Sequence, residues 1–143
     1  MTNELAFVCF PREKRHHEPL RGQSILIVED EPLITMDLTL AFEHTGAELT
    51  STNTLKHALL LVEHDGLSAV ILDHSLGDDD STLLCRRLTE RGIPYMIYSG
   101  YPKRDDAPDD LVYVSKPASH EKIVAAMEGL IGCAEEKLPK RIG

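Results

Sequence analysis

Five polar residues in this sequence have side chains that together suit phosphoryl transfer: Glu29, Asp30, Asp73, Ser99 and Lys116. An aspartate can act as a nucleophile and form an acyl phosphate. Several carboxylates placed close together need a cation, and a site made only of oxygen ligands favours Mg²⁺. Phosphoryl transfer also needs neutralisation of the phosphoryl oxygens, which an ammonium and a hydroxyl group can provide. Each of these residues taken alone could simply cap a helix or end a strand. The prediction of a common site therefore depends on all five lying at the ends of successive strands.

The spacing of apolar residues predicts the strands that would bring these side chains together. Continuous apolar runs are typical of strands buried on both faces of a parallel sheet, and the sequence has four: Ile25–Val28, Ala69–Leu72, Tyr95–Tyr98 and Leu111–Val114. A more polar run, 47–51, suits an edge strand. The five polar residues follow the four apolar runs, at the strand ends where open parallel sheets bind ligands.

Helical patterns separate these runs and predict an α/β sandwich. Pro32 can open the first helix and Gly46 can close it, and the other apolar stripes lie at 55–62, 83–88 and 123–131. The segment between the fourth and fifth strands, 100–110, contains two prolines and many charges. Little more than one or two helical turns would fit there, so we expect the fourth helix to be short or missing.

Composition and charge narrow the class of protein. The chain has 143 residues and a formal net charge of −9, so a nucleic acid is not an expected partner. No apolar stretch is long enough to span a bilayer, and the first residues lack the features of a secretion signal. The three widely spaced cysteines fit a reducing compartment. We therefore expect a cytoplasmic protein that does not associate with membranes.

Domain boundaries are expected near residues 23 and 133. Residues 1–23 read as an N-terminal extension with disorder in part of it, 24–133 as the domain, and 134–143 as a charged C-terminal tail. That tail is too short for an effector domain, so the output is expected to pass through another protein.

Four segments together resemble the receiver domain of two-component response regulators: ILIVEDE (25–31), AVILD (69–73), YSGY (98–101) and SKP (115–117). The resemblance covers about residues 24–133. It implies a flavodoxin-like, doubly wound sheet of five parallel strands in the order 2-1-3-4-5, with helices on both faces. The sequence Ser99–Gly100–Tyr101 resembles that of a subgroup of stand-alone, single-domain receivers.

The resemblance also implies a role for each residue. Asp73 would be the phosphoacceptor, assisted by Lys116 and Ser99, while Ser99 and Tyr113 would be the switch residues. The metal site would hold Mg²⁺, with Mn²⁺ able to substitute, through these ligands: Glu29, Asp30, Asp73 and the backbone carbonyl of Ser75. The chain departs from the family pattern at Gly77, which replaces a usual proline, and at His74.

As a receiver, the chain would take its phosphoryl group from a sensor histidine kinase or a histidine phosphotransfer protein. It would catalyse only its own phosphorylation and dephosphorylation. Its signal would pass to a downstream protein that the sequence does not identify, through a phosphorelay, a phosphate sink or phosphorylation-dependent binding. The resemblance leaves homodimerisation open.

Two other classes compete with this interpretation. Phosphohydrolases of the haloacid dehalogenase type also use an aspartyl nucleophile, Mg²⁺ and lysine, but they need a second acid two residues later, where this chain has Ser75. They also usually need a cap region. A receiver-like module that binds partners without phosphate is the other class, and the complete set of five polar residues argues against it. A flavodoxin-like nucleotide-binding protein is weaker still, because no glycine-rich loop follows the first strand.

Overall fold

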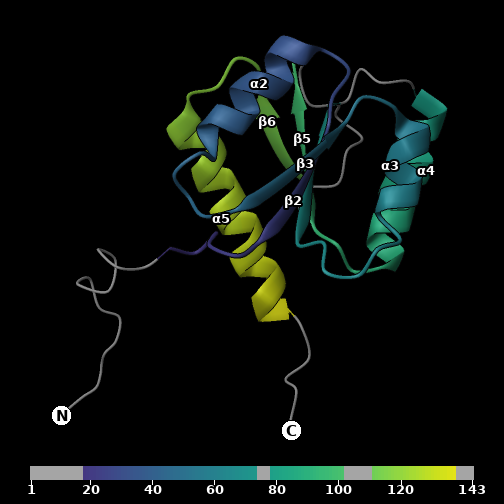
Figure 1. The fold of residues 1–143 in the computed structure, drawn as a ribbon. Coiled ribbons are helices and arrows are strands. Elements are labelled where there is room, and N and C mark those ends of the chain that lie inside the picture. The colour runs from purple at the N-terminus through teal and green to yellow at the C-terminus, as the bar shows by residue number, and fades with distance from the viewer. Residues whose placement is uncertain (1–17, 74–77, 102–110, 138–143) are drawn as a thin grey trace, which may run out of the picture.

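A computed structural model describes residues 18–73, 78–101 and 111–137 of the chain (Figure 1). Within these ranges the chain forms five strands and four helices. In chain order they are β2 (Ser24–Val28), α2 (Pro32–Ala41), β3 (Glu48–Thr52), α3 (Leu55–Leu61), β4 (Ala69–Asp73), α4 (Asp78–Glu90), β5 (Tyr95–Ser99), β6 (Val112–Ser115) and α5 (His120–Lys137).

The five strands form one sheet in the order β3-β2-β4-β5-β6, and every neighbouring pair is parallel. Counted along the chain, this is the order 2-1-3-4-5, which confirms the predicted doubly wound, flavodoxin-like α/β fold. The predicted short or missing fourth helix falls largely on residues 102–110, which lie outside the described residues.

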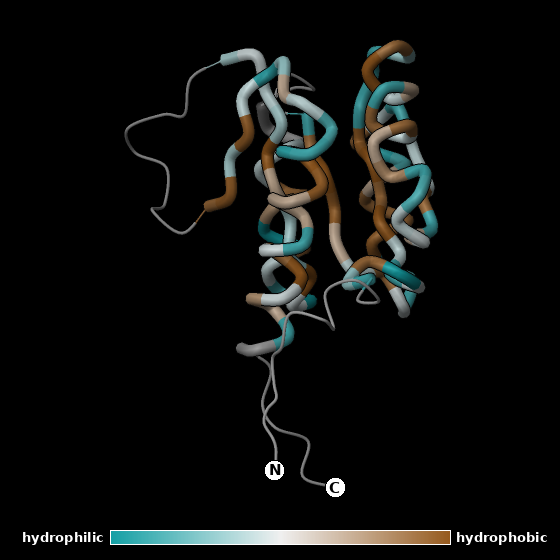
Figure 2. Tube along the Cα trace, turned by 90° about the vertical axis from the view of Figure 1, so that its left-hand side faces the viewer, coloured by the Kyte–Doolittle hydropathy of each residue, from teal (hydrophilic) through white to brown (hydrophobic). Residues whose placement is uncertain are grey.

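Helices cover both faces of the sheet, α2 with α5 on one side and α3 with α4 on the other (Figures 1 and 2). Each face has its own core. Ile25 and Ile27 point into the cluster beside α2 and α5, while Leu26 and Val28 point into the cluster beside α3 and α4. Because successive strand residues face opposite sides, a strand between two cores must be apolar throughout. Polar side chains are therefore concentrated at the strand ends.

The first helix begins where the sequence predicts and ends earlier. Pro32 occupies its first turn, and the Glu31 carboxylate caps it by accepting a hydrogen bond from the Leu33 N–H at 3.5 Å. The helix ends at Ala41, and turns connect it to Gly46. Gly46 has a φ of +83°, and a Cβ there would lie 3.1 Å from the Arg21 backbone, so glycine suits this turn.

The folded core also includes a residue that precedes the first strand. Leu20 lies in the segment that the sequence assigns to the N-terminal extension, yet its side chain is buried in the cluster beside α2 and α5. No helix within the described ranges is long and apolar enough to cross a membrane.

A pair of identical substitutions on α2 tests this packing. Leu38 is fully buried and Leu33 is 70% exposed. Leu38→Ala should lower the free energy of unfolding by about 2–5 kcal/mol, because it leaves a cavity in the core. Leu33→Ala should change it by less than about 1 kcal/mol. Urea unfolding followed by circular dichroism measures both, and equal losses would contradict the orientation of α2.

Candidate functional site

Three carboxylates meet at the carboxyl edge of the sheet. Glu29 directly follows β2, Asp30 comes next, and Asp73 is the last residue of β4. One oxygen from each side chain can be chosen so that all three atoms lie within 4.8 Å of one another. Glu29 and Asp73 are almost completely buried, whereas Asp30 is exposed. Because β2 and β4 are paired neighbours, the sheet itself brings these acids together.

Lys116 holds the two buried acids together. Its Nζ atom lies 3.3 Å from Glu29 Oε1 and 3.3 Å from Asp73 Oδ1. The Lys116 backbone N–H donates a hydrogen bond of 2.7 Å to the Ser99 carbonyl, which fixes the chain just after β6 against the end of β5. The same ammonium lies 5.5 Å from the centroid of the Tyr98 ring.

The negative charge of this cluster exceeds its positive charge. Burial raises the pKa of Glu29 to about 7, and the hydrogen bond and the charge of Asp73 add to this shift, while Lys116 and the Glu31 N–H act in the opposite direction. Three ionised carboxylates beside one ammonium would leave a local excess of two negative charges. This donor set, made of oxygen atoms with surplus negative charge, fits a hard divalent cation.

Ser99 and Tyr113 are connected through the backbone of Tyr101. The buried Ser99 hydroxyl accepts a hydrogen bond of 3.0 Å from the Tyr101 N–H. The Tyr113 hydroxyl donates to the Tyr101 carbonyl. The two residues expected to form the switch therefore contact the same residue, on its amide and carbonyl sides.

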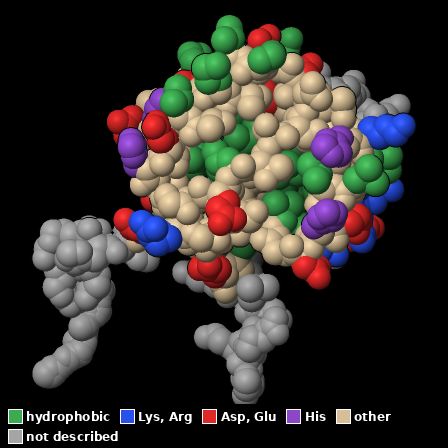
Figure 3. Space-filling model, viewed as in Figure 1, with side chains coloured by type: hydrophobic (Ala, Val, Ile, Leu, Met, Phe, Trp, Pro, Cys, Tyr) green, Lys and Arg blue, Asp and Glu red, His purple; other side chains and the backbone are tan. Residues whose placement is uncertain are grey.

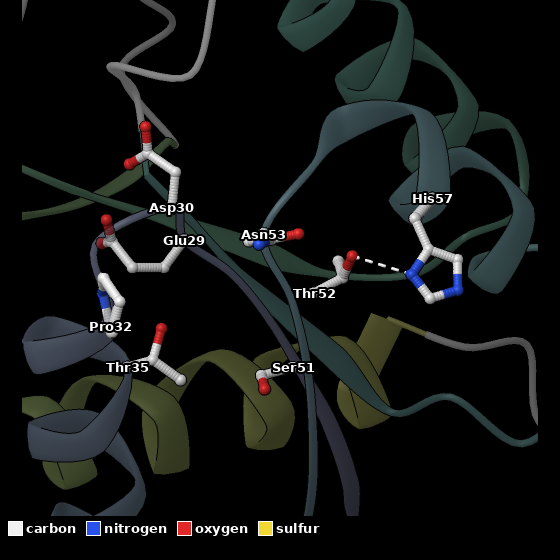
Figure 4. Close-up of a pocket in the computed structure, with 8 residues that line it drawn as sticks. All are labelled: Glu29, Asp30, Pro32, Thr35, Ser51, Thr52, Asn53 and His57. Carbon is white, nitrogen blue, oxygen red and sulfur yellow. Dashed lines mark hydrogen bonds between the residues drawn. The ribbon is translucent and has the colours of Figure 1, made fainter.

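An open hollow of about 360 Å³ lies beside the acids, toward β3 and α3. Figure 4 shows Glu29 and Asp30 at one side of it and His57 at the other, with the His57 ring bound through Nδ1 to the Thr52 hydroxyl at 2.9 Å. Among the described residues its lining consists of Glu29, Asp30, Pro32, Thr35, Ser51, Thr52, Asn53 and His57. The acid cluster therefore opens toward α2 and β3, where Asp30 is its exposed member.

The structure brings together most of the residues that the sequence singled out. One cluster contains Glu29, Asp30, Asp73 and Lys116. The carbonyl of Ser99 is joined to this cluster by its hydrogen bond from the Lys116 N–H. The Ser75 carbonyl, together with His74 and Gly77, lies outside the described residues. Sequence reasoning missed the contacts of Tyr98 and Tyr101, although both belong to the YSGY segment that it quoted.

The raised pKa of Glu29 gives a prediction about stability without metal. A folded-state pKa above the unfolded value of about 4.5 means that folding favours protonated Glu29. This stabilisation is complete below about pH 4.5 and is lost as the pH rises through about 7. In EDTA at pH 8, Glu29→Gln should therefore raise the melting temperature by about 3–5 °C, and the gain should be smaller at pH 5.

Thermal melts at both pH values measure this difference. Glu43→Gln makes the same change at an exposed position and serves as the control. Mg²⁺ should stabilise the wild type more than Glu29→Gln. A variant that is less stable than the wild type at pH 8 in EDTA would show that Glu29 is not destabilised by its surroundings.

Comparisons with known proteins identify the family of this chain. The family model of the response regulator receiver domain matches residues 25–128. The chain is 33% identical over 114 residues to the transcriptional regulatory protein PmrA of Pectobacterium parmentieri, covering 75% of this chain and 51% of PmrA. It is 27% identical over 115 residues to the transcriptional regulatory protein TrcR of Mycobacterium tuberculosis, covering 75% of this chain and 44% of TrcR. It therefore spans about half the length of these curated relatives.

Solved structures give the same result. The BeF3-activated conformation of SdrG from Pseudomonas melonis is 35% identical, with a TM-score of 0.61 and coverage of 76% of this chain and 98% of that chain. The response regulator PhyR from Brucella abortus is 27% identical, with a TM-score of 0.71 and coverage of 83% of this chain and 52% of that chain. Mg²⁺ binding at an acidic pocket and phosphorylation are characteristic of the family that these matches identify. This chain belongs to the receiver domain family of two-component response regulators.

Proposed function

We propose that this protein is a single-domain response regulator that receives a phosphoryl group on Asp73 from a sensor histidine kinase or a histidine phosphotransfer protein. The observation that carries the proposal is the position of Lys116, whose ammonium lies 3.3 Å from both Asp73 and Glu29. An ammonium in this position can neutralise a phosphoryl oxygen on Asp73. The nearby acids add the donor set for a cation.

Glu29, Asp30 and Asp73 would hold Mg²⁺, for which Mn²⁺ can substitute. The backbone carbonyl of Ser75 is the further ligand that the family resemblance implies. When bound, the cation supplies the positive charge that lets an anionic carboxylate approach an anionic phosphoryl group. The residues of the chain then position the reacting atoms, and the chain acts only on its own phosphoryl group.

The transfer step forms one bond and breaks another. A carboxylate oxygen of Asp73 attacks the phosphorus of a phosphohistidine on the partner, so an O–P bond forms while the donor's N–P bond breaks and the imidazole leaves with the electron pair. The result is an acyl phosphate on Asp73. Lys116 would contact the phosphoryl group. Release of free phosphate requires attack by water on the phosphorus, with the Asp73 carboxylate as the leaving group.

Ser99 and Tyr113 are proposed to report the phosphoryl group to partners. The Ser99 hydroxyl accepts from the Tyr101 N–H, and Tyr113 donates to the Tyr101 carbonyl. If the Ser99 side chain rotates so that its hydroxyl donates to a phosphoryl oxygen, its oxygen moves away from the Tyr101 N–H, and the Tyr113 contact with the Tyr101 carbonyl is disturbed as well. A small rearrangement can then bias the surface around β6 and α5 between two states.

The output is proposed to pass through protein–protein contacts, as a phosphorelay shuttle, a phosphate sink or a phosphorylation-dependent binder. We propose a receiver centred on residues 24–133. Leu20, from the extension 1–23, packs into its core, and α5 continues into the charged tail 134–143 as far as Lys137. We propose that the protein works in the cytoplasm with its kinase. Homodimerisation is a further arrangement compatible with this function.

The exposed face of α2 supports a protein as the phosphodonor. Leu33, Met36 and Leu40 are 70%, 58% and 49% exposed, and hydrophobic side chains gather over α2 at the top of Figure 3. Pro32, at the start of the same helix, lines the hollow with Glu29 and Asp30. A protein whose phosphohistidine reaches Asp73 must cover the protein surface beside this hollow. We therefore propose that the donor packs on this apolar face of α2.

Labelling with acetyl phosphate tests the phosphoacceptor. Wild-type protein with Mg²⁺ should gain the mass of one phosphate, and EDTA should prevent this gain. Asp73→Asn should gain none, because an amide is not a nucleophile for this reaction. Intact mass spectrometry measures each case. A wild type that stays unlabelled with metal contradicts the proposal, and sustained release of phosphate from small phosphomonoesters would favour a hydrolase instead.

A panel of purified, autophosphorylated histidine kinases tests the donor surface. For the kinases that label the wild type, Met36→Asp should slow transfer about tenfold or more, because it places a charge within an apolar contact. Its labelling by acetyl phosphate should stay unchanged. Leu60→Asp alters a 65% exposed leucine on α3 and should transfer normally. Phosphoryl transfer to Met36→Asp at the wild-type rate would show that the donor does not bind this face of α2.

A further inference from the structure

Tyr98 lies directly beside the proposed phosphoacceptor in the sheet. It is the fourth residue of β5, where it pairs with Asp73 on β4 and with Val114 on β6. Side chains of directly paired residues in neighbouring strands project from the same face of a sheet. Tyr98 therefore projects from the face that carries Asp73, toward the cluster beside α2 and α5, and it is only 4% exposed.

The ammonium of Lys116 is the charged group that contacts this ring. Its Nζ atom lies 5.5 Å from the ring centroid, within the range of a cation–π interaction. The same atom lies 3.3 Å from each of the Glu29 and Asp73 carboxylates. An aromatic face is electron-rich and attracts a cation, whereas an aliphatic side chain of similar size would only exclude water.

A lysine side chain has a flexible stem of four carbons and loses considerable rotamer freedom when it is held in one place. The two carboxylates constrain Lys116 on one side of its ammonium. Their electrostatic attraction for the ammonium changes during the reaction. When Asp73 becomes an acyl phosphate, its carboxylate charge moves out to the phosphoryl oxygens. The Tyr98 ring carries no charge that the reaction alters, so it can support the ammonium both before and after transfer.

We infer that Tyr98 is a positioning residue for phosphoryl transfer, which holds the Lys116 ammonium over its ring beside Asp73. This inference rests on the proposed function, since it assigns Tyr98 a role in that reaction through Lys116. The competing explanation is that Tyr98 only fills the core. The two explanations differ for phenylalanine and leucine, because phenylalanine keeps the aromatic face and leucine keeps only the apolar volume.

Nuclear magnetic resonance of the unphosphorylated protein tests the contact itself. Protons over an aromatic face are shifted upfield by the ring, so the Lys116 side-chain methylene signals next to Nζ should lie upfield of free lysine in the wild type. Tyr98→Phe should retain this shift and Tyr98→Leu should abolish it. This measurement does not depend on phosphate, metal or a partner.

The rate of labelling by acetyl phosphate at saturating Mg²⁺ tests the role. Tyr98→Leu should be labelled about threefold to tenfold more slowly, the range expected for loss of one partly buried cation–π contact. Tyr98→Phe should stay within about twofold of the wild type. In a Lys116→Ala background, Tyr98→Leu should cause little further loss, because the group that the ring holds is already absent.

Met96→Leu is the matched control, since Met96 is buried in the same cluster two residues earlier on β5. It should label normally. Tyr98→Met replaces Tyr98→Leu if the leucine variant does not fold, as judged by thermal melting. The inference is overturned if Tyr98→Leu labels at the wild-type rate or if Tyr98→Phe is as slow as Tyr98→Leu. A wild type that takes no phosphate overturns the proposed function instead, and this inference with it.

Discussion

Glu29 and Asp73 are two almost completely buried carboxylates, and the ammonium of Lys116 lies 3.3 Å from each of them. Burying a charge is costly unless it is paired, and a single lysine cannot offset these two acids together with Asp30. Burial, aided by the hydrogen bond and the charge of Asp73, accordingly raises the pKa of Glu29 to about 7. Either protonation of Glu29 or a bound cation would reduce this repulsion, so metal binding would increase the stability of the site.

The sheet makes this crowding possible. Apolar side chains on both faces of β2 and β4 fill two separate cores, so polar groups are excluded from the strands until their carboxyl ends. Parallel pairing then puts the end of β2 beside the end of β4 and the end of β5 beside that of β6. Lys116 reaches the acids from just beyond β6, because the Ser99 carbonyl anchors its backbone. The packing of the whole domain thus contributes to the position of one ammonium.

The same constraint explains what could be predicted from sequence. Four continuous apolar runs and one more polar run identified the five strands to within about a residue. The acids at the ends of the buried strands followed, because a buried strand tolerates a charge only there. The burial of Leu20 and the early end of α2 at Ala41 could not be predicted, since both depend on packing between distant segments. The contact between Tyr98 and Lys116 depends on strand register and on the path of a flexible side chain, neither of which has a local sequence signal.

The site has a closed side and an open side, and this division would separate the two proposed tasks, receipt of the phosphoryl group and its recognition by a partner. Glu29, Asp73 and Ser99 are buried, whereas Asp30 is exposed and borders the hollow beside α2. The proposed phosphodonor would therefore approach Asp73 from the open side, past Asp30 and α2. The hydrogen bonds through Tyr101 lead the other way, from Ser99 toward Tyr113 on β6. Phosphoryl transfer to Asp73 and recognition of the phosphorylated state would then use different surfaces. One partner could bind α2 while another binds the region around β6.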